Sequence, residues 1–293
     1  MPINYHYLIS SWIYKTFAAA DGDFANWLHN HGYAFNGNRK FKLFTFSNLQ
    51  LAGAKIIKGK NPVLSVSPGS HQILLTFYME EAAQYFIQGL FAGRELVIAD
   101  KNHRAVFNVN SVEHLPAPDF QSTCVFKSIS PIVLSKGRMD NNKLRAQYLS
   151  PEDDDYGFWL KENLIRKYIA AHQERVATSE ITTTGQNHFA DLPFKIDNWN
   201  FRLLGTPKSK LLTIKEGTPM ESKIRGYLYT FELTASPELM SFAYHAGFGE
   251  KCSLGMGCVE REDGRRKREE ERGKREEGRR EKGEGRGERG ENG

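Results

Sequence analysis

Hydrophobic residues recur along the chain with two different spacings. Over residues 41–46, Phe-Lys-Leu-Phe-Thr-Phe, bulky and polar side chains alternate, which predicts a strand. Over residues 80–92, Ala82, Phe86 and Leu90 recur every four positions, which predicts a helix that buries one face. Several such helical stretches are followed by glycine, a residue common just past helix ends. The chain is therefore expected to fold from short strands and amphipathic helices.

The first half is expected to contain two helices near its start. The first begins at the capping pair Ser10-Ser11 and runs through Phe17. The second begins near Asp23 and ends before Gly32, and residues 33–40 form a loop. With the helix over 80–92, the expected strands are 3–8, 41–46, 54–57, 63–66, 72–78, 95–98 and 105–112.

The second half is expected to begin after Pro116-Ala-Pro118, where a domain boundary is predicted. Two helix starts, Ser150-Pro151-Glu152 and Ser236-Pro237-Glu238, each combine a capping hydroxyl, a first-turn proline and an acid. Gly247 ends the second of these helices. The expected strands are 123–126, 182–184, 200–204, 211–215, 224–233 and a last one near Val259.

Both halves end in the same order: strand, helix, glycine, strand. This order predicts an α+β fold of two tandem ferredoxin-like (RRM-like, βαββαβ) domains, over residues 1–118 and 119–260. Residues 261–293 contain no apolar side chain, so a disordered tail is expected. Its 13 basic and 11 acidic residues nearly cancel, which favours a solvated polyampholyte over an RNA-contacting arm. A frameshift into purine-rich DNA would give the same composition.

Composition excludes few classes of partner or cellular location. Of the 293 residues 40% are hydrophobic, and the formal charge of +5 permits an anionic partner without requiring one. Three cysteines are too few for a disulfide framework and suit a reducing cytoplasm, the expected location. No membrane-spanning apolar stretch and no secretory signal are visible, so no membrane partner is expected.

The most specific motif is the glycine-rich segment over residues 247–257, Gly-Phe-Gly-Glu-Lys-Cys-Ser-Leu-Gly-Met-Gly. Glycines allow positive φ and a close approach of backbone amides to a ligand, and successive exposed amides suit a phosphate. The segment matches neither a Walker A motif nor a dinucleotide fingerprint. A hairpin without a ligand is the simpler alternative, but two Gly-x-Gly pairs between a capped helix and a terminal strand are more specific than one.

This segment resembles the C-terminal glycine-rich loop of the CRISPR-associated repeat-processing endoribonucleases, the sixth Cas family of the repeat-associated mysterious protein (RAMP) superfamily. That loop typically reads G-F-G-E-K-N-S-L-G-x-G, so Cys252 stands where Asn is usual. Ser11-Trp-Ile-Tyr14, Trp27-Leu-His29 and residues 41–47 also resemble family segments, in family order. The resemblance spans residues 1–260.

The resemblance implies cleavage of precursor CRISPR RNA within its repeats, without a metal or other cofactor. The 2′-hydroxyl attacks the adjacent phosphate and leaves a 2′,3′-cyclic phosphate and a 5′-hydroxyl. The family's Tyr, His and Lys fall on Tyr14, His29 and Lys42. The implied partner is repeat RNA (pre-crRNA); a CRISPR effector complex and a homodimer are left open. A cleavage-inactive repeat-binding protein and a structural subunit of a CRISPR ribonucleoprotein are the alternatives.

These three residue types suit the reaction. Histidine can act as base or acid at neutral pH, Lys42 can stabilise charge on the phosphorane, and Tyr14 can donate a hydrogen bond. Tyr14 could instead only pack, and His31 could be the working histidine, since the two histidines point about 200° apart on a helix. His245, Cys252 and Cys258 lack a zinc spacing.

RNA binding is expected at the glycine segment, across the fold from the chemistry, and at Arg39 and Lys40, which are also alternatives to Lys42 in the reaction. The expected RNA-binding residues are Arg39, Lys40, Gly247, Gly249, Lys251, Ser253, Gly255 and Gly257. A basic series on the preceding strands, equally consistent with a solvated face, consists of Lys208, Lys210, Lys215, Lys223 and Arg225.

Overall fold

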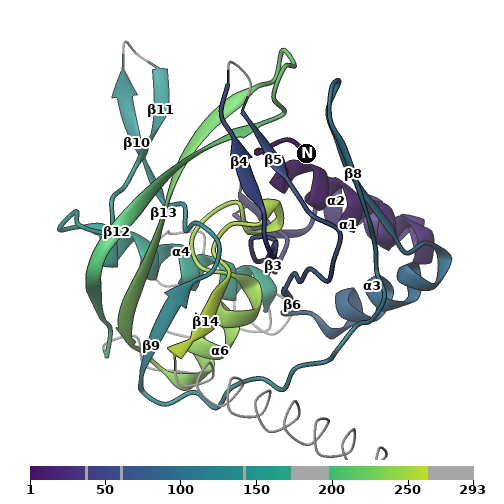
Figure 1. The fold of residues 1–293 in the computed structure, drawn as a ribbon. Helices are drawn as coiled ribbons and strands as arrows, with labels where there is room; N and C mark the ends of the chain where they lie inside the picture. The colour runs from purple at the N-terminus through teal and green to yellow at the C-terminus, as the bar shows by residue number, and fades with distance from the viewer. Residues whose placement is uncertain (37–38, 60–61, 141–142, 173–197, 263–293) are drawn as a thin grey trace, which may run out of the picture.

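The computed structural model describes residues 1–36, 39–59, 62–140, 143–172 and 198–262 (Figure 1). The first half contains α1 (His6–Ala20), α2 (Gly22–Asn30), β1 (Tyr33–Phe35), β2 (Arg39–Phe41), β3 (Phe44–Phe46), β4 (Lys55–Ile57), β5 (Val63–Ser65), β6 (Leu75–Phe77), α3 (Glu80–Ala92), β7 (Glu95–Ala99) and β8 (Arg104–Asn108). The second contains β9 (Thr123–Ser128), β10 (Ser135–Asp140), β11 (Lys143–Tyr148), α4 (Tyr156–Ala171), β12 (Asn200–Ile214), β13 (Ser222–Thr234), α6 (Pro237–Ala246), the 3-10 turn η1 (Cys252–Leu254) and β14 (Val259–Arg261). The strand expected over 182–184 and nearly all of the tail lie outside the described residues.

The second half has a ferredoxin-like sheet. Its strands lie in the order β12-β13-β9-β14, and each neighbouring pair is antiparallel. Along the chain, β9, α4, β12, β13, α6 and β14 follow the βαββαβ order, with the hairpin β10–β11 inserted before α4. The arrangement predicted for this half is therefore present, with one additional hairpin.

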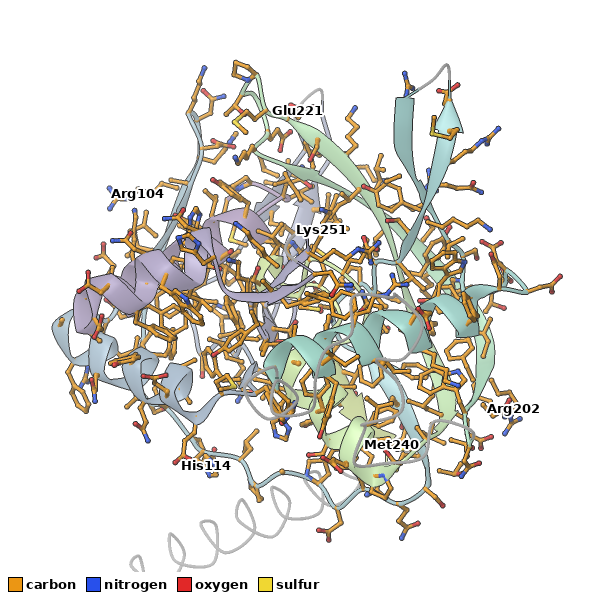
Figure 2. The ribbon with its side chains drawn as sticks, turned by 180° about the vertical axis from the view of Figure 1, so that it is seen from behind. Arg104, His114, Arg202, Glu221, Met240 and Lys251 are labelled. Carbon is orange, nitrogen blue, oxygen red and sulfur yellow. The ribbon has the colours of Figure 1, made fainter. Side chains whose placement is uncertain are left out.

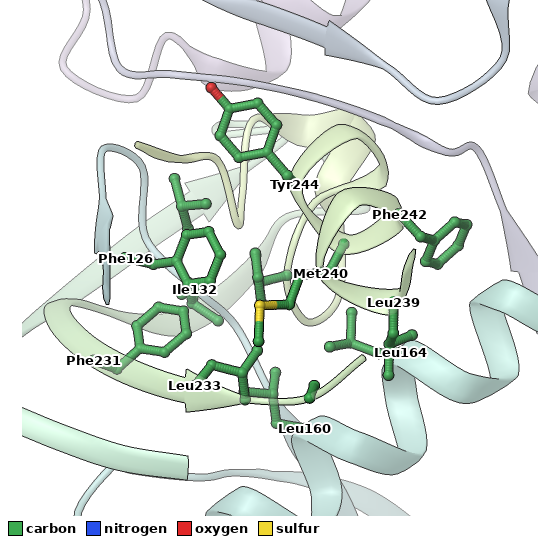
Figure 3. Close-up of a cluster of buried hydrophobic side chains, with 14 of the residues drawn as sticks. Phe126, Ile132, Leu160, Leu164, Phe231, Leu233, Leu239, Met240, Phe242 and Tyr244 are labelled. Carbon is green, nitrogen blue, oxygen red and sulfur yellow. The ribbon is translucent and has the colours of Figure 1, made fainter. Parts of the chain in front are cut away.

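The helices of the second half bury their apolar faces against this sheet. Met240 of α6 is fully buried and lies near the centre of the cluster in Figure 3. Leu160 and Leu164 of α4 approach it from one side, and Phe126 and Phe231 of the sheet from the other. Each fully buried side chain of this size contributes about 1.5–3 kcal/mol to folding.

In the first half, α1 and α3 pack together over short strands. Ile13 and Phe17 of α1 and Phe86 of α3 share a buried cluster with Phe44 of β3. A Cβ built at Gly89 of α3 would lie 1.8 Å from a backbone oxygen of α1, so only glycine allows the two helices to approach this closely.

The predicted start of the chain is wrong. Residues 3–8 do not form a strand; Pro2 bridges to Val63, and α1 already begins at His6. The helix does not start at Ser10-Ser11, because Ser10 is buried within α1, one turn inside. A serine can cap a helix, but it marks the helix start only where the buried apolar face does not extend to earlier residues, as it does here to Tyr5 and Ile9.

Four further elements differ from the prediction, and one hairpin is additional. The expected loop over 33–40 belongs to the hairpin β1–β2, and the strand over 41–46 is interrupted at Leu43, which has φ 54°. Ser150-Pro151-Glu152 forms a turn that precedes α4 by several residues. The strands over 200–204 and 211–215 are one strand, β12, with a register shift. The hairpin β10–β11 was not predicted.

The helix over 80–92, the strands β4, β5, β7 and β8, the capped helix α6 and the strand near Val259 are confirmed, although β8 already ends at Asn108. Ser236 caps α6 by accepting the amide of Leu239 at 3.2 Å. No helix in the described part of the chain is both long and apolar enough to cross a membrane.

Candidate catalytic site

Helix α2 is fixed at both ends by polar side chains. At its start, Asp21 accepts the amide of Phe24 at 2.7 Å. At its end, the Lys42 ammonium donates to the His29 carbonyl at 2.8 Å and also to the Leu28 carbonyl. Carbonyls of the last helical turn have no partner within the helix, and a cation there also meets the negative end of the helix dipole. Lys42 therefore holds the backbone at His29 in place.

Lys40 caps the next carbonyl of α2, that of Asn30. Its ammonium donates to the Asn30 carbonyl at 2.8 Å, so two lysines of the segment 40–42 satisfy the end of α2. Gly32, with φ 58°, allows the chain to return this closely. A Cβ there would lie 2.5 Å from the Phe41 carbonyl and 3.0 Å from the Lys42 ammonium. The expected role of Lys40 in RNA binding competes with this capping contact.

Tyr14 and His29 come together where α1 crosses α2. Their ring centroids are 5.2 Å apart, and the rings meet edge to face at 85°. Phe17 and Phe44 support the Tyr14 ring from its other sides. The His29 side chain is exposed, and its Nδ1 lies 3.1 Å from the Asn30 amide oxygen. The ring that contacts Tyr14 belongs to His29 and not to His31.

Burial sets the protonation state of two of these groups. It raises the pKa of Tyr14 to about 12, and a hydrogen bond with the Ser253 side chain opposes this shift. The Tyr14 hydroxyl therefore keeps its proton at neutral pH and can act as a hydrogen-bond donor. Burial, with the neighbouring charge of Lys40, lowers the pKa of Lys42 to about 8. The Lys42 charge is therefore present at neutral pH and lost in mild alkali.

The glycine segment meets this site, so the expectation that it lies on the other side of the fold is wrong. The turn η1 packs against α1 and β3, and its Ser253 side chain lies beside the Tyr14 hydroxyl, where it lowers the pKa that burial raises. Figure 1 shows the segment between the two halves of the chain. Sequence reasoning missed this contact because residues 14 and 253 are joined only by tertiary packing.

Most amides of the glycine segment are used within the protein. Gly247, Gly255 and Gly257 donate to the carbonyls of Ala243, Cys252 and Pro131, each at 2.9 Å. All four glycines of the segment have φ between 76° and 85° and are buried. In this conformation the amides of these three glycines are not available to a phosphate. The exposed Lys251 (labelled in Figure 2) and the half-buried Ser253 are the better candidates for RNA contact, together with the exposed Arg39.

We expect Gly257→Ala to destabilise the protein strongly. A Cβ at this position would lie 1.9 Å from the Phe248 carbonyl oxygen, and the φ of 76° disfavours any other residue. Strain of this kind costs about 1–3 kcal/mol for φ alone, and the clash adds to it. Denaturant unfolding measures the loss. Gly93→Ala is the control, since no atom lies within 4 Å of its Cβ; equal unfolding midpoints for the two variants would contradict the packing described here.

The basic residues of β12 and β13 do not form one stripe. The register pairs Lys210 with Gly226 and Leu211 with Arg225, so Lys208 and Lys210 lie on one face of the hairpin and Lys223 and Arg225 on the other. A single RNA strand that follows one face would meet only one of these pairs.

No metal-binding cluster is found within the described ranges: no three His, Cys, Asp or Glu side chains are placed to hold an ion. His245 bonds the Ser241 carbonyl at 2.8 Å, and Cys252 and Cys258 are buried.

Comparison with known proteins identifies both halves. The family model for the N-terminal part of CRISPR-associated protein Cas6 matches residues 1–112, and the model for its C-terminal part matches residues 115–261. The CRISPR-associated endoribonuclease Cas6 1 of Methanocaldococcus jannaschii is 27% identical over 272 residues, which cover 88% of this chain and 86% of that protein. An endoribonuclease-like Cas6 protein of Pyrococcus furiosus is 26% identical over 262 residues, 89% of this chain and 92% of that protein.

The fold is also that of solved structures. The product of a Cas6-related gene from Pyrococcus furiosus superposes with a TM-score of 0.69 at 23% identity, over 89% of this chain and 91% of that one. The predicted fold class, two tandem ferredoxin-like domains, is confirmed. The division at residues 118 and 260 stays a prediction.

Proposed function

The chain belongs to the Cas6 family of CRISPR-associated proteins, and we propose that it is an endoribonuclease that binds CRISPR repeat RNA and cleaves precursor crRNA within the repeats. The observation that supports this most is the cluster of Tyr14, His29 and Lys42. Three successive segments of the first half, α1, α2 and the chain after β2, supply one protonated hydroxyl, one exposed imidazole and one partly buried cation.

The proposed reaction is attack of the ribose 2′-hydroxyl on the adjacent phosphate. The exposed His29 exchanges a proton with the 2′-oxygen or the departing 5′-oxygen, because a histidine can act as base or acid at neutral pH. Tyr14 keeps its proton and donates a hydrogen bond to an oxygen at the reacting phosphate. Lys42 holds His29 by its carbonyl and brings a positive charge near the phosphate as negative charge develops. The products are a 2′,3′-cyclic phosphate and a 5′-hydroxyl, and no step in this scheme uses a metal.

A second candidate is a protein of the same family that binds repeat RNA without cutting it, alone or within a ribonucleoprotein complex. This candidate is considered because the Pyrococcus furiosus relative is named as endoribonuclease-like and not as an endoribonuclease. The two proposals share their RNA surface and differ at Tyr14, His29 and Lys42. Incubating the purified protein with a labelled repeat from beside its gene, and with a scrambled RNA of equal length, separates them. Cleavage of the repeat alone supports the enzyme; tight repeat binding without cleavage supports the second candidate.

We expect Tyr14→Phe to lower the cleavage rate constant at saturating RNA about 10-fold to 100-fold, with the RNA dissociation constant nearly unchanged. The substitution keeps the ring contacts with Phe17, Phe44 and His29 and removes only the hydroxyl. The expected loss corresponds to one hydrogen bond to a charged group, which is worth about 1.5–3 kcal/mol. Tyr7→Phe, two helical turns before Tyr14 on α1, is the control. An unchanged rate for Tyr14→Phe would leave Tyr14 as a packing residue only.

A further inference from the structure

A buried lysine of α4 also holds the glycine segment. Lys167 of α4 is 3% exposed, and it is the one charged side chain among the buried residues of the described chain. Its ammonium donates to the Gly247 carbonyl at 2.8 Å and to the Cys252 sulfur at 3.1 Å. An isolated buried ammonium is costly, so these contacts are what allow a lysine at this position.

The environment of Lys167 explains how the charge is stabilised. Gly247 is the residue that ends α6, so the ammonium lies at the carbonyl end of that helix, where a cation is favoured. The neighbouring Leu164 and Tyr168 anchor α4 in the core of the second half. Lys167 is therefore fixed to a rigid helix, and the segment it contacts is fixed to it.

The two acceptors of Lys167 bracket the first part of the glycine segment. A Cβ built at Gly247 would lie 2.8 Å from the Cys252 sulfur, so residues 247 and 252 fold back on each other, and Lys167 contacts both. Ser253 follows Cys252 directly in η1, which packs against α1, and its side chain lies beside the Tyr14 hydroxyl. The contacts thus form a continuous path from α4 through Cys252 and Ser253 to the Tyr14 hydroxyl.

We propose that Lys167 is a positioning residue for cleavage: by holding Gly247 and Cys252 it places Ser253 against Tyr14. The proposal rests on the proposed function, since Tyr14 is taken to act in cleavage. It also gives a reason for the residue type at position 252. A side chain there must accept a hydrogen bond from the ammonium, which a cysteine sulfur does weakly and an asparagine oxygen does well.

The test compares Lys167→Met with Lys161→Met, which removes a lysine from the same helix without touching the segment. Single-turnover cleavage of repeat RNA gives the rate constant at saturating protein and the dissociation constant separately. For Lys167→Met we expect the rate constant to fall about 10-fold to 100-fold, because small displacements of catalytic groups have effects of this size, and the dissociation constant to change less than about threefold. Hydrogen exchange of the amides of residues 247–258 is expected to accelerate in this variant and not in Lys161→Met.

A second pair of variants covers the case in which Lys167→Met does not fold. Cys252→Asn keeps an acceptor for the ammonium and is expected to cleave within about threefold of the original protein. Cys252→Val removes the acceptor at similar size and is expected to cleave about 3-fold to 10-fold more slowly than Cys252→Asn, a difference typical of one neutral hydrogen bond. Equal rates for these two variants would overturn the proposal, as would unchanged cleavage and exchange in Lys167→Met. If the unaltered protein cuts no repeat RNA, the proposed function fails, and the exchange experiment alone still shows whether Lys167 holds the segment.

Discussion

His29→Ala is expected to lower the rate constant for cleavage of the cognate repeat about 10²-fold to 10⁴-fold, the range that general acid or base groups contribute. His29 is exposed, and its ring contacts Tyr14, so the substitution removes the proton-transfer group and little packing. Single-turnover kinetics at saturating protein measures the loss. His31→Ala, two residues away and also exposed, is the matched control and is expected to stay within about threefold of the original rate. A full loss with His31→Ala and none with His29→Ala would move the chemistry to His31.

Lys42→Met is expected to lower the same rate constant about 10²-fold to 10³-fold, the usual effect of removing one group that stabilises transition-state charge. The substitution also removes the hydrogen bonds to the carbonyls of Leu28 and His29, so part of the loss reflects a displaced His29. Lys42→Arg keeps the charge and is expected to retain more activity than Lys42→Met. Equal activity of the two variants would show that the charge at this position has no part in the reaction.

The pH dependence of cleavage separates these contributions. Because the pKa of Lys42 is lowered to about 8, the ammonium is lost as pH rises through that value, and the cleavage rate is expected to fall above it. Unfolding does not explain this fall. Between about pH 8 and pH 10.5, Lys42 is more protonated in the unfolded chain than in the folded chain. Its titration therefore raises the free energy of unfolding as the pH rises through that range. Lys42→Arg is expected to abolish the alkaline decline, since an arginine keeps its charge there.

The sequence predicted most of the framework because periodicity and glycine placement carry that information locally. The helix over 80–92 and the capped helix after Ser236 match the structure, since each apolar face begins and ends with a local signal. The start of α1 could not be placed in the same way. Ser10 has the chemistry of a cap, but tertiary packing extends the buried face upstream to Tyr5.

The residues of the candidate site stay a prediction, and only their arrangement comes from the structure. Tyr14, His29 and Lys42 were chosen by resemblance, and the contact of Tyr14 with His29 is a property of how α1 crosses α2. The contact of Ser253 with Tyr14 joins opposite ends of the chain and has no local signal. Lys167, in contrast, has a local signal in the sequence. It lies seven residues after Leu160 and three after Leu164, at an apolar position of α4 where a lysine is unusual.

The most direct test of the account is to map both ends of the RNA after cleavage of one labelled repeat in the presence of EDTA, with the unaltered protein and with His29→Ala. We predict one cut within the repeat, a 2′,3′-cyclic phosphate on one fragment and a 5′-hydroxyl on the other, undiminished by EDTA and nearly absent with His29→Ala. A 3′-hydroxyl with a 5′-phosphate, or cleavage that EDTA abolishes, would contradict the proposed chemistry at Tyr14, His29 and Lys42.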